Sequence, residues 1–447
     1  MSLASIPEIA ALESGGEGVR LPPGDTAPLT PRVRALLDTA DMRRLARVSQ
    51  LGLVGLVYPG AVHSRLEHSL GVYRLAIEFL RRLKDDSRFT TAVGPDDASA
   101  FIAAALVHDI GHWPFCHPIE DMGLAEIPRH ESLVEGILAS GPVADVLDSS
   151  WGIPPQRIAS LITGTAADPA GRILHSLLSG PIDVDKMDYL ARDSLHAGVP
   201  YGRNFDQPRL LASLCLDERG EALAITDKGR TAAELMVFAR YVMFSEVYWH
   251  HAVRSATAML QRAVWLVRAA VDPAVVVRTD DPGFTAWLAA VAEGTPAAPL
   301  VAGLFGPRRQ LFKRAASFDA LRQPEVHAAL AGRRYDDMVA VSSRLAARLS
   351  PHIGRAIDPH LLLVDAPPVE REVEFRLQIR ERPDRGGATA PRWRRLEDVS
   401  PVVRSLAHEQ FDNLVKRVRI FAEPDVAAAI AHCDGLEAML VEAAHGD

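Results

Sequence analysis

ASAFIAAALVHDIGHWPFCHP, residues 98–118, is the stretch that decides the fold. It begins with a run of apolar and small residues, which is typical of a helix buried on all sides within a bundle. The run ends at His108-Asp109, and His112 and His117 follow in a turn that contains Gly and Pro. Because a buried ionisable group needs a partner or a metal, this ending predicts a cluster of ligands.

The composition narrows the function classes. The 447 residues are 48% hydrophobic, which is enough for a large core, and the formal net charge of -8 argues against a protein built mainly to coat nucleic acid. A local basic groove stays open as an alternative. Three scattered cysteines predict a reducing, cytoplasmic compartment. We see no secretory pattern and no apolar run of membrane-span length, so we expect neither export nor membrane insertion.

Helical periodicity dominates the chain between residues 31 and 355. The segments that carry it best are 31–50 (one helix or a helix pair), 64–83, 98–109, 131–147 and 232–271. Residues 1–30, rich in Gly and Pro, predict an irregular lead-in. Residues 356–447 predict a small α+β region, with strands at 361–364, 373–379 and 418–421 and a loop at 382–390. The expected fold is mostly α, a helical bundle with this small α+β C-terminal appendage.

Residue types in three of the helices suggest a metal centre. One histidine, a His-Asp pair and an aspartate from a third helix would supply two neutral nitrogens and two carboxylates. That set suits a divalent Mn, Fe, Ni, Co or Mg ion better than a structural zinc. Any one of these residues alone would be interpreted as a satisfied polar group in a bundle, whereas their combination predicts a metal site. Arg65, Lys186 and Arg240, if the fold brings them near, would neutralise phosphate charge.

Four stretches occur in a fixed order along the chain: YPGAVHSRLEHSLGV (58–72), LVHDIGHWPFCH (106–117), HE (130–131) and IDVDKMDYLARD (182–193). This set resembles the HD-domain phosphohydrolases, and within them the deoxynucleoside triphosphate (dNTP) triphosphohydrolases related to the mammalian SAM-and-HD-domain enzyme. The resemblance covers about residues 32–425 and implies an HD-domain helical bundle over residues 31–355. It also implies a homo-oligomer, a dimer or a tetramer, and we expect no SAM domain ahead of the HD region.

The resemblance assigns roles to individual residues. It implies that one divalent metal is bound by His68, His108, Asp109 and Asp185, with room for a second metal that arrives with the substrate phosphates. It implies phosphate contacts from Arg65, Lys186 and Arg240, and a deoxyribose neighbourhood formed by Gln50, Tyr189, Asp193 and Tyr248. His112, His117 and His130 match catalytic-site histidines, with His117 protonating the leaving 5′ oxygen and Glu120 orienting His117. The implied reaction is attack of a metal-activated water on the α-phosphorus of a dNTP, which releases a deoxynucleoside and tripolyphosphate.

Two departures from the family pattern bear on regulation and geometry. Glu120 stands where the family often has aspartate, and GGEGVRLPP stands where the mammalian enzyme has an element of its activating-nucleotide site, so we do not expect nucleotide activation of that kind. Two other functions stay open. One is an HD-type phosphatase or phosphodiesterase on a monophosphate, modified or cyclic nucleotide, and the other is a nucleotide-sensing or nucleic-acid-binding regulator with little turnover.

Overall fold

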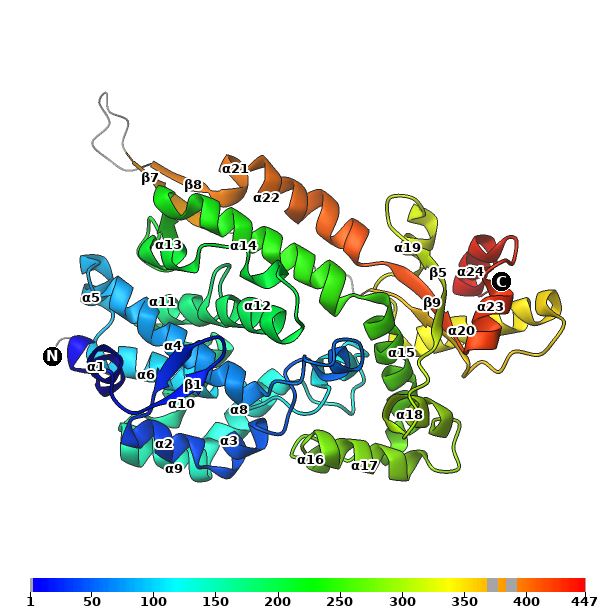
Figure 1. Cartoon of the computed structure of the whole chain (residues 1–447), viewed down its shortest axis with the longest axis horizontal. Helices are drawn as coiled ribbons and strands as arrows, with labels where there is room; N and C mark the ends of the chain where they lie inside the picture. The colour runs from blue at the N-terminus through cyan, green and yellow to red at the C-terminus, as the bar shows by residue number, and fades with distance from the viewer. Residues whose placement is uncertain (1–2, 368–376, 383–391, 447) are drawn as a thin grey trace.

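Helices make up most of the protein (Figure 1). The structure, a computed structural model, describes residues 3–367, 377–382 and 392–446. Helix α6 (Pro95–Val107) lies inside the helical body and packs against α4 (Arg65–Leu83), α10 (Pro155–Thr163) and α11 (Pro169–Leu178). Every residue from Ala100 to Val107 is buried. The predicted core helix and the mostly α fold are therefore confirmed.

The helices that begin at residues 65 and 184, α4 and α12, both start at side-chain caps. The Ser64 hydroxyl accepts a hydrogen bond from the backbone N–H of Glu67 at the start of α4, and Asp183 accepts one from Lys186 N–H at the start of α12 (Val184–His196). Such caps satisfy backbone donors that a helix start leaves free. Helices α6 and α12 both pack against α4. Polar residues at the end of α6 and at the starts of α4 and α12 are thereby brought to one region.

The turn after α6 is fixed by a buried arginine and a glycine. Arg44, from α3 (Ala40–Leu45), donates to the carbonyl oxygens of Ile110 and His112 at 2.9 and 2.8 Å. A Cβ at Gly111 would collide with the carbonyl oxygen of His130, where α8 (His130–Ala139) begins. Glycine at 111 thus lets α8 approach the turn, and α7 (Cys116–Glu120) follows it.

The segment 232–271, expected to be one long helix, is interrupted. It divides into α14 (Arg230–Met243), a π-helical turn at Phe244–Tyr248 and α15 (His251–Leu266). His250 has an extended backbone with ψ 136°, which ends the helical path before α15. Apolar periodicity continues through such a break, so the sequence alone did not reveal it.

The strands form small sheets at the periphery. One has the order β3 (Leu214–Leu216), β4 (Leu223–Thr226), β7 (Gln378–Glu381), β8 (Arg392–Arg395). Another has the order β5 (Lys313–Phe318), β9 (Val418–Ala422), β6 (Leu362–Asp365). The structure has strands near the expected 361–364 and 418–421, and residues 378–379 of the third expected strand lie in β7. Residues 373–376 of the third and 383–390 of the expected loop lie outside the described residues. Both sheets cross the expected boundary at residues 355/356, and the three-part division of the chain stays a prediction.

Residues 3–30 are structured, which corrects the expected irregular lead-in over this part of residues 1–30. They contain α1 (Pro7–Ser14) and a hairpin of β1 (Gly18–Leu21) and β2 (Asp25–Pro28). The Tyr73 hydroxyl donates to the carbonyl oxygen of Pro28, and Thr30 donates to Glu8, which is fully buried. Gly and Pro mark only the turns of this region, and contacts with α4 order the rest.

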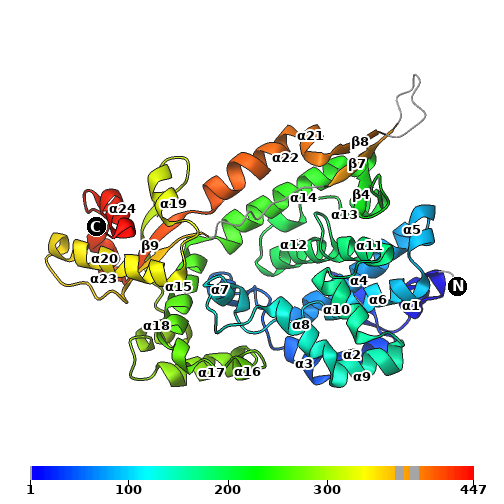
Figure 2. The same ribbon diagram turned by 180° about the vertical axis from the view of Figure 1, so that it is seen from behind.

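The other helices complete the body and the C-terminal half (Figure 2). They are α2 (Pro31–Leu37), α5 (Ser87–Ala92), α9 (Pro142–Val146), α13 (Gln207–Ala212), α16 (Pro273–Val276), α17 (Asp281–Ala292), α18 (Ala298–Phe305), α19 (Pro324–Leu330), α20 (Tyr335–Ile353), α21 (Leu396–Val399), α22 (Pro401–Ser405), α23 (Pro424–Ile430) and α24 (Leu436–His445). In the described ranges, none of the helices combines the length and apolar character that crossing a membrane requires.

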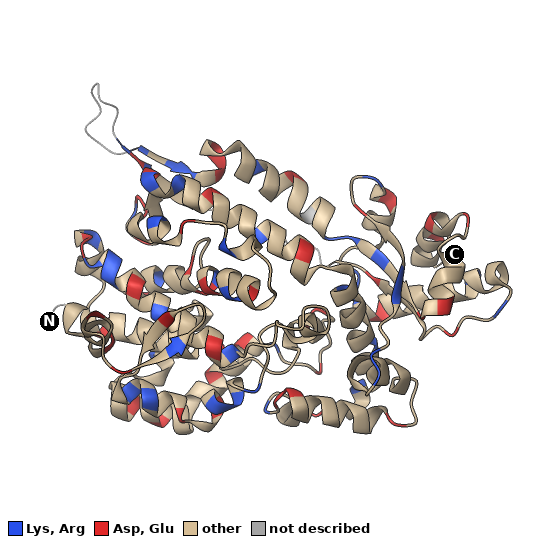
Figure 3. Ribbon diagram, in the orientation of Figure 1, with Lys and Arg blue, Asp and Glu red and all other residues tan. Residues whose placement is uncertain are grey.

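Charged residues of both signs are interspersed along the ribbon (Figure 3). The arginines of strand β8 have acidic neighbours: Arg392 and Arg394 lie within 4.0 Å of Glu381, and Arg395 lies 3.5 Å from Glu397. Each of these three arginines thus has an acidic partner nearby.

A buried ion pair joins α15 to β6 and yields a stability prediction. Arg254 contacts Asp365 with two hydrogen bonds of 2.6 and 3.1 Å. Asp365→Ala leaves a buried cation without its partner, so it should lower the free energy of unfolding by about 3–5 kcal/mol. Replacing both residues, as Arg254→Met with Asp365→Leu, should restore most of that loss. Urea denaturation, monitored by tryptophan fluorescence, gives the free energy of unfolding of both variants. Equal destabilisation by the single and the double change would contradict the account.

Candidate active site

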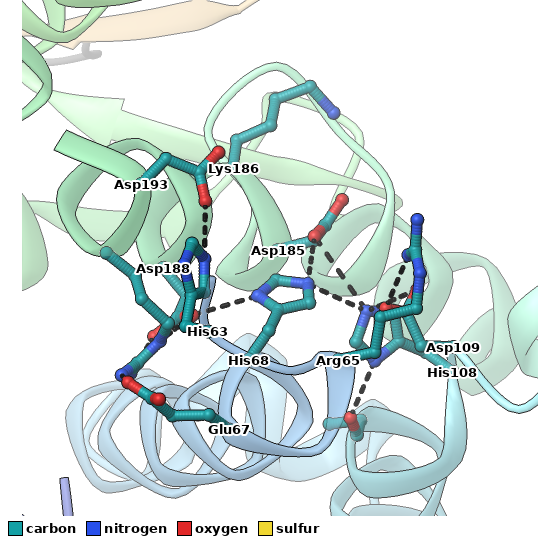
Figure 4. A network of polar contacts seen from close by, with 12 residues as sticks. His63, Arg65, Glu67, His68, His108, Asp109, Asp185, Lys186, Asp188 and Asp193 are labelled. Carbon is teal, nitrogen blue, oxygen red and sulfur yellow. Dashed lines mark hydrogen bonds and ion pairs between the residues drawn. The ribbon is translucent and has the colours of Figure 1, made fainter. Parts of the chain in front are cut away.

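Three predicted metal ligands converge where α4, α6 and α12 meet (Figure 4). His68 Nε2 lies 3.2 Å from His108 Nε2 and 3.0 Å from Asp185 Oδ1, and His108 Nε2 lies 3.8 Å from the same oxygen. Asp109, the fourth predicted ligand, has its Oδ1 3.4 Å from His108 Nε2.

The donor set fits a divalent metal. Ligands bonded at about 2.1 Å and at right angles lie about 3.0 Å from each other, which is close to the separations seen here. The outer nitrogens are also fixed: His108 Nδ1 donates to the carbonyl oxygen of Ala105 and His68 Nδ1 contacts Asp188 Oδ2, both at 2.9 Å. These contacts direct both Nε2 lone pairs toward the common point, as in known metal sites. The residues are therefore positioned to bind a metal, without selecting one.

The acidic surroundings act on His68. Burial by itself would lower the pKa of His68, but hydrogen bonds with Asp185 and Asp188 and the charge of Asp109 raise it to about 10. The negative potential that favours a proton on this ring equally favours a metal cation. Proton and metal would therefore compete for the same nitrogen.

Asp109 connects the metal ligands with the catalytic histidines. Its Oδ2 accepts a hydrogen bond from Arg65 at 2.9 Å, and its Oδ1 lies 3.1 Å from His112 Nδ1. Burial would raise the pKa of Asp109, but His112, His108 and Arg65 keep it well below its ordinary value. Burial and the charge of Arg65 lower the pKa of His112. Asp109 is thus ionised and His112 neutral near pH 7.

The predicted catalytic histidines gather beside Asp109. The rings of His112 and His130 are 3.9 Å apart, and the ring of His117 is 5.1 Å from the first and 4.9 Å from the second. Glu120 differs from the expectation: its carboxylate accepts from His130 Nδ1 at 2.8 Å and from His130 N–H at 2.7 Å. The close approach of α8 at Gly111 brings His130 to this carboxylate, so Glu120 orients His130 in place of His117.

The residues predicted around the sugar form a second polar group. The Tyr248 hydroxyl donates to Asp193 Oδ2 at 2.6 Å, and His63 Nε2 contacts Asp193 Oδ1 at 2.9 Å. Burial and the charge of Asp193 raise the pKa of Tyr248, so its hydroxyl keeps the proton that it donates. Burial raises the pKa of Tyr189 as well, and the positive charge of Arg240 opposes the rise at both tyrosines.

A cavity of about 300 Å³ contains most of this machinery. The predicted residues that line it are Gln50, Arg65, His68, His108, Asp109, His112, His117, His130, Asp185 and Tyr189. Those that do not line it are Glu120, Lys186, Asp193, Arg240 and Tyr248. Lys186 extends away from the histidines (Figure 4) and donates to Asp183 at 2.7 Å.

Several buried polar atoms at this site have no hydrogen-bond partner in the part of the chain that the structure describes. They are Gln50 Oε1 and Arg65 Nε, whose residues line the cavity, and Arg240 Nε, whose residue does not. Leaving a buried polar group unpaired is costly, so such atoms at one site favour a ligand that pairs with them.

A larger cavity, of about 740 Å³, lies elsewhere and is lined by Arg308, Arg309, Lys313 and Arg314 among others. None of the predicted site residues lines it. The smaller cavity, with its metal donors and shifted pKa values, is therefore the candidate active site.

The sequence analysis assigned no role to Asp188, Arg192 or His63, which support the site. Asp188 contacts His68 and accepts two hydrogen bonds from Arg192 at 2.9 and 2.8 Å. Asp188 follows Asp185 by three residues and Arg192 follows Asp188 by four, so helical spacing was a usable signal. His63 gave no such signal, since its partner Asp193 is distant in sequence.

Comparison with known families fits this geometry. Residues 65–164 match the HD domain, and residues 205–438, more than half of the chain, match the HD associated region. The chain belongs to the HD-domain phosphohydrolase family. The resemblance inferred from the four motifs is confirmed at this level.

Two relatives show the range of the similarity. The chain is 38% identical over 230 residues to YwfO of Bacillus subtilis, which covers 51% of this chain and 50% of that protein. It is 31% identical over 252 residues to the deoxynucleoside triphosphate triphosphohydrolase SAMHD1 of Gallus gallus, covering 49% of this chain and 40% of that one. The chain spans about half the length of the first of these relatives and less of the second.

Solved structures of similar fold cover nearly the whole chain. A hypothetical protein from Aquifex aeolicus superposes with a TM-score of 0.69 at 23% identity, covering 93% of this chain and 99% of that one. A phosphohydrolase from Bacteroides thetaiotaomicron gives a TM-score of 0.64 at 20% identity, covering 91% and 99%. At these identities the two structures support the fold alone.

The raised pKa of His68 yields a prediction for metal binding. Because His68 is protonated in the metal-free protein near pH 7.5, Mn²⁺ binding should release about one proton per metal and tighten as the pH rises. Calorimetric titration in buffers of different ionisation enthalpy counts this proton. His251 does not line the smaller cavity, so the control variant His251→Ala should release the same number of protons per metal bound. A binding enthalpy independent of the buffer would contradict the assignment of His68.

Proposed function

We propose that this protein hydrolyses deoxynucleoside triphosphates to a deoxynucleoside and tripolyphosphate, with a divalent metal and with water attacking the α-phosphorus. The observation that carries the proposal is that metal donors and unpartnered guanidinium nitrogens occur together at one site. A polyphosphate needs both a cation on its oxygens and fixed positive groups around it. Similarity to the deoxynucleoside triphosphate triphosphohydrolase SAMHD1 of Gallus gallus supports the same substrate class.

The metal would be held by His68, His108, Asp109 and Asp185. When bound there, a divalent cation lowers the pKa of water and offsets charge on phosphoryl oxygens. Mn, Fe, Ni, Co and Mg all accept nitrogen and carboxylate donors of this kind. A second ion, if present, would come with the substrate phosphates.

The cationic side chains would bind the triphosphate. Arg65 uses one nitrogen on Asp109 and leaves its buried Nε for a phosphate oxygen. Arg240 has a buried, unpartnered Nε as well. Lys186 would have to exchange its contact with Asp183 for the phosphate. Guanidinium groups suit this role because they stay charged and donate in a fixed geometry.

His117 would protonate the leaving 5′ oxygen. Its side chain lines the cavity and is accessible to solvent there, while the surrounding protein and the charges of Arg65 and His130 lower its pKa below the ordinary value. The ring is therefore neutral in the free protein near pH 7. A bound polyphosphate, being strongly negative, raises the pKa of a nearby imidazole, so the proton would become available when substrate is present.

The nucleoside would lie toward Tyr189 and Tyr248. The Tyr248 hydroxyl donates its hydrogen bond to Asp193, so toward a sugar hydroxyl it can act only as an acceptor. The same proposal includes the expected homo-oligomer, a dimer or a tetramer.

Product analysis tests the proposal. The purified protein is incubated with each dNTP and NTP and with Mn²⁺ or Mg²⁺, with and without a second nucleotide, and the products are separated by chromatography. We expect tripolyphosphate and a deoxynucleoside from at least one dNTP, little turnover of NTPs, and a loss of at least about a hundredfold in His108→Ala, which removes a metal ligand.

Other results would favour the alternatives. Release of orthophosphate alone would favour a phosphatase acting on another phosphate ester. Nucleotide binding with no product in the presence of either metal would favour a regulator.

A further inference from the structure

One line of polar contacts runs from the metal ligands to the side of α4 that faces α12 (Figure 4). His68 Nδ1 contacts Asp188 at 2.9 Å, and both oxygens of Asp188 accept hydrogen bonds from Arg192 at 2.9 and 2.8 Å. The third nitrogen of Arg192 donates to Glu67 Oε1 at 2.8 Å. The guanidinium thus joins a residue of α12 to a residue of α4.

A second line runs from the sugar side to the same carboxylate. Asp193 accepts from Tyr248 and contacts His63 Nε2 at 2.9 Å. The ring of His63 stacks on that of His196, with centroids 4.3 Å apart and planes 16° apart. His196 Nε2 lies 2.9 Å from Glu67 Oε1, the oxygen that also accepts from Arg192. We call Glu67, Arg192 and His196 the Glu67 junction.

The Glu67 junction is enclosed and its charges are matched. The side chain of Arg192 is 6% exposed and that of Glu67 is 22% exposed. Burial would raise the pKa of Glu67, but hydrogen bonds from His196 and Arg192 lower it, so the carboxylate is ionised. Bidentate guanidinium pairs with carboxylates are among the stronger and more directional polar contacts in proteins.

The packing of α4 on α12 depends on this arrangement. A Cβ on Gly71 would collide with Asp188 Oδ1 and with Arg192 Nη2. Glycine at this point lets α4 lie directly against the Asp188–Arg192 pair. The two helices supply different metal donors, His68 from α4 and Asp185 from α12.

We infer that Arg192, Glu67 and His196 are positioning residues that fix α4 against α12, so that His68 and Asp185 face the same metal. The His63–His196 stack extends this support to Asp193 and Tyr248 at the nucleoside end. The first part rests on the metal site, and the second rests on the proposed function. Residues that orient metal ligands through hydrogen bonds commonly contribute 10–100-fold to metal affinity.

Metal titration without substrate tests the first part. The full chain is depleted of metal with a chelator and titrated with Mn²⁺ by calorimetry, and its thermal unfolding is recorded. Glu67→Gln and Arg192→Lys should each weaken Mn²⁺ binding by about 10–100-fold. Gly71→Ala should also weaken it, although alanine is the better helix former.

The matched control is Glu78→Gln, on the same helix. Glu78 pairs with Arg74 and Arg81 away from the site, so its Mn²⁺ affinity should equal that of the wild type. If folded Glu67→Gln and Arg192→Lys bind Mn²⁺ as the wild type does, the inference is wrong. Should Glu67→Gln fail to fold, His196→Phe, which leaves Arg192 bonded to Asp188 and Glu67, tests the same point.

Two histidine variants distinguish support of the metal ligands by His196 from support of the nucleoside end by His63. His196→Phe keeps an aromatic ring against His63 but loses the bond to Glu67, so it should weaken Mn²⁺ binding. His63→Phe keeps the stack but loses the bond to Asp193, so it should raise KM for the dNTP while Mn²⁺ affinity stays unchanged. Identical effects of both variants on Mn²⁺ affinity and on KM would contradict the inferred division. If the wild type turns over no dNTP, the proposed function fails, and the Mn²⁺ results still decide the role of the Glu67 junction.

Discussion

The imidazole of His68, placed between Asp185 and Asp188, is the contact on which the site depends. The two aspartates are one helical turn apart on α12, so they lie on the same face and engage both ring nitrogens. This fixes the orientation of the ring and the position of α4 relative to α12. The end of α6 then places His108 Nε2 3.2 Å away, and three helices share one donor cluster.

Around this cluster the protein leaves polar groups unsatisfied. Arg65 and Arg240 each keep a buried nitrogen without a partner in the described chain, and Gln50 keeps a buried oxygen. A core selected only for stability would pair these atoms, because each unpaired group costs free energy on burial. Unpaired buried polar atoms are expected where a bound ligand supplies the missing hydrogen-bond partners. The oxygens of a triphosphate could accept hydrogen bonds from both arginines.

Much of this was predictable from local sequence. The apolar run before His108, the helix 64–83 and the acidic segment 182–193 predicted the three helices by their periodicity. The resemblance pointed to four candidate metal ligands, and the structure brings three of them, His68, His108 and Asp185, together. The partner of Glu120 was not predictable, because it depends on the close approach of His130 at Gly111. The helical spacing of Asp185, Asp188 and Arg192 indicated a shared helix face, but the contact of Asp188 with His68 depends on the packing of α12 on α4. The strand pairings also escaped prediction, since β7 pairs with β4 from a distant part of the chain.

The position of bond cleavage is the central claim, and an oxygen-isotope experiment tests it most directly. A dNTP that the protein hydrolyses is converted in a single turnover in ¹⁸O-labelled water, and the products are analysed by mass spectrometry. Attack of water on the α-phosphorus, with cleavage of the bond to the 5′ oxygen, puts one ¹⁸O into tripolyphosphate and none into the deoxynucleoside. Label in orthophosphate beside a deoxynucleoside diphosphate, or label in the nucleoside, would contradict the account.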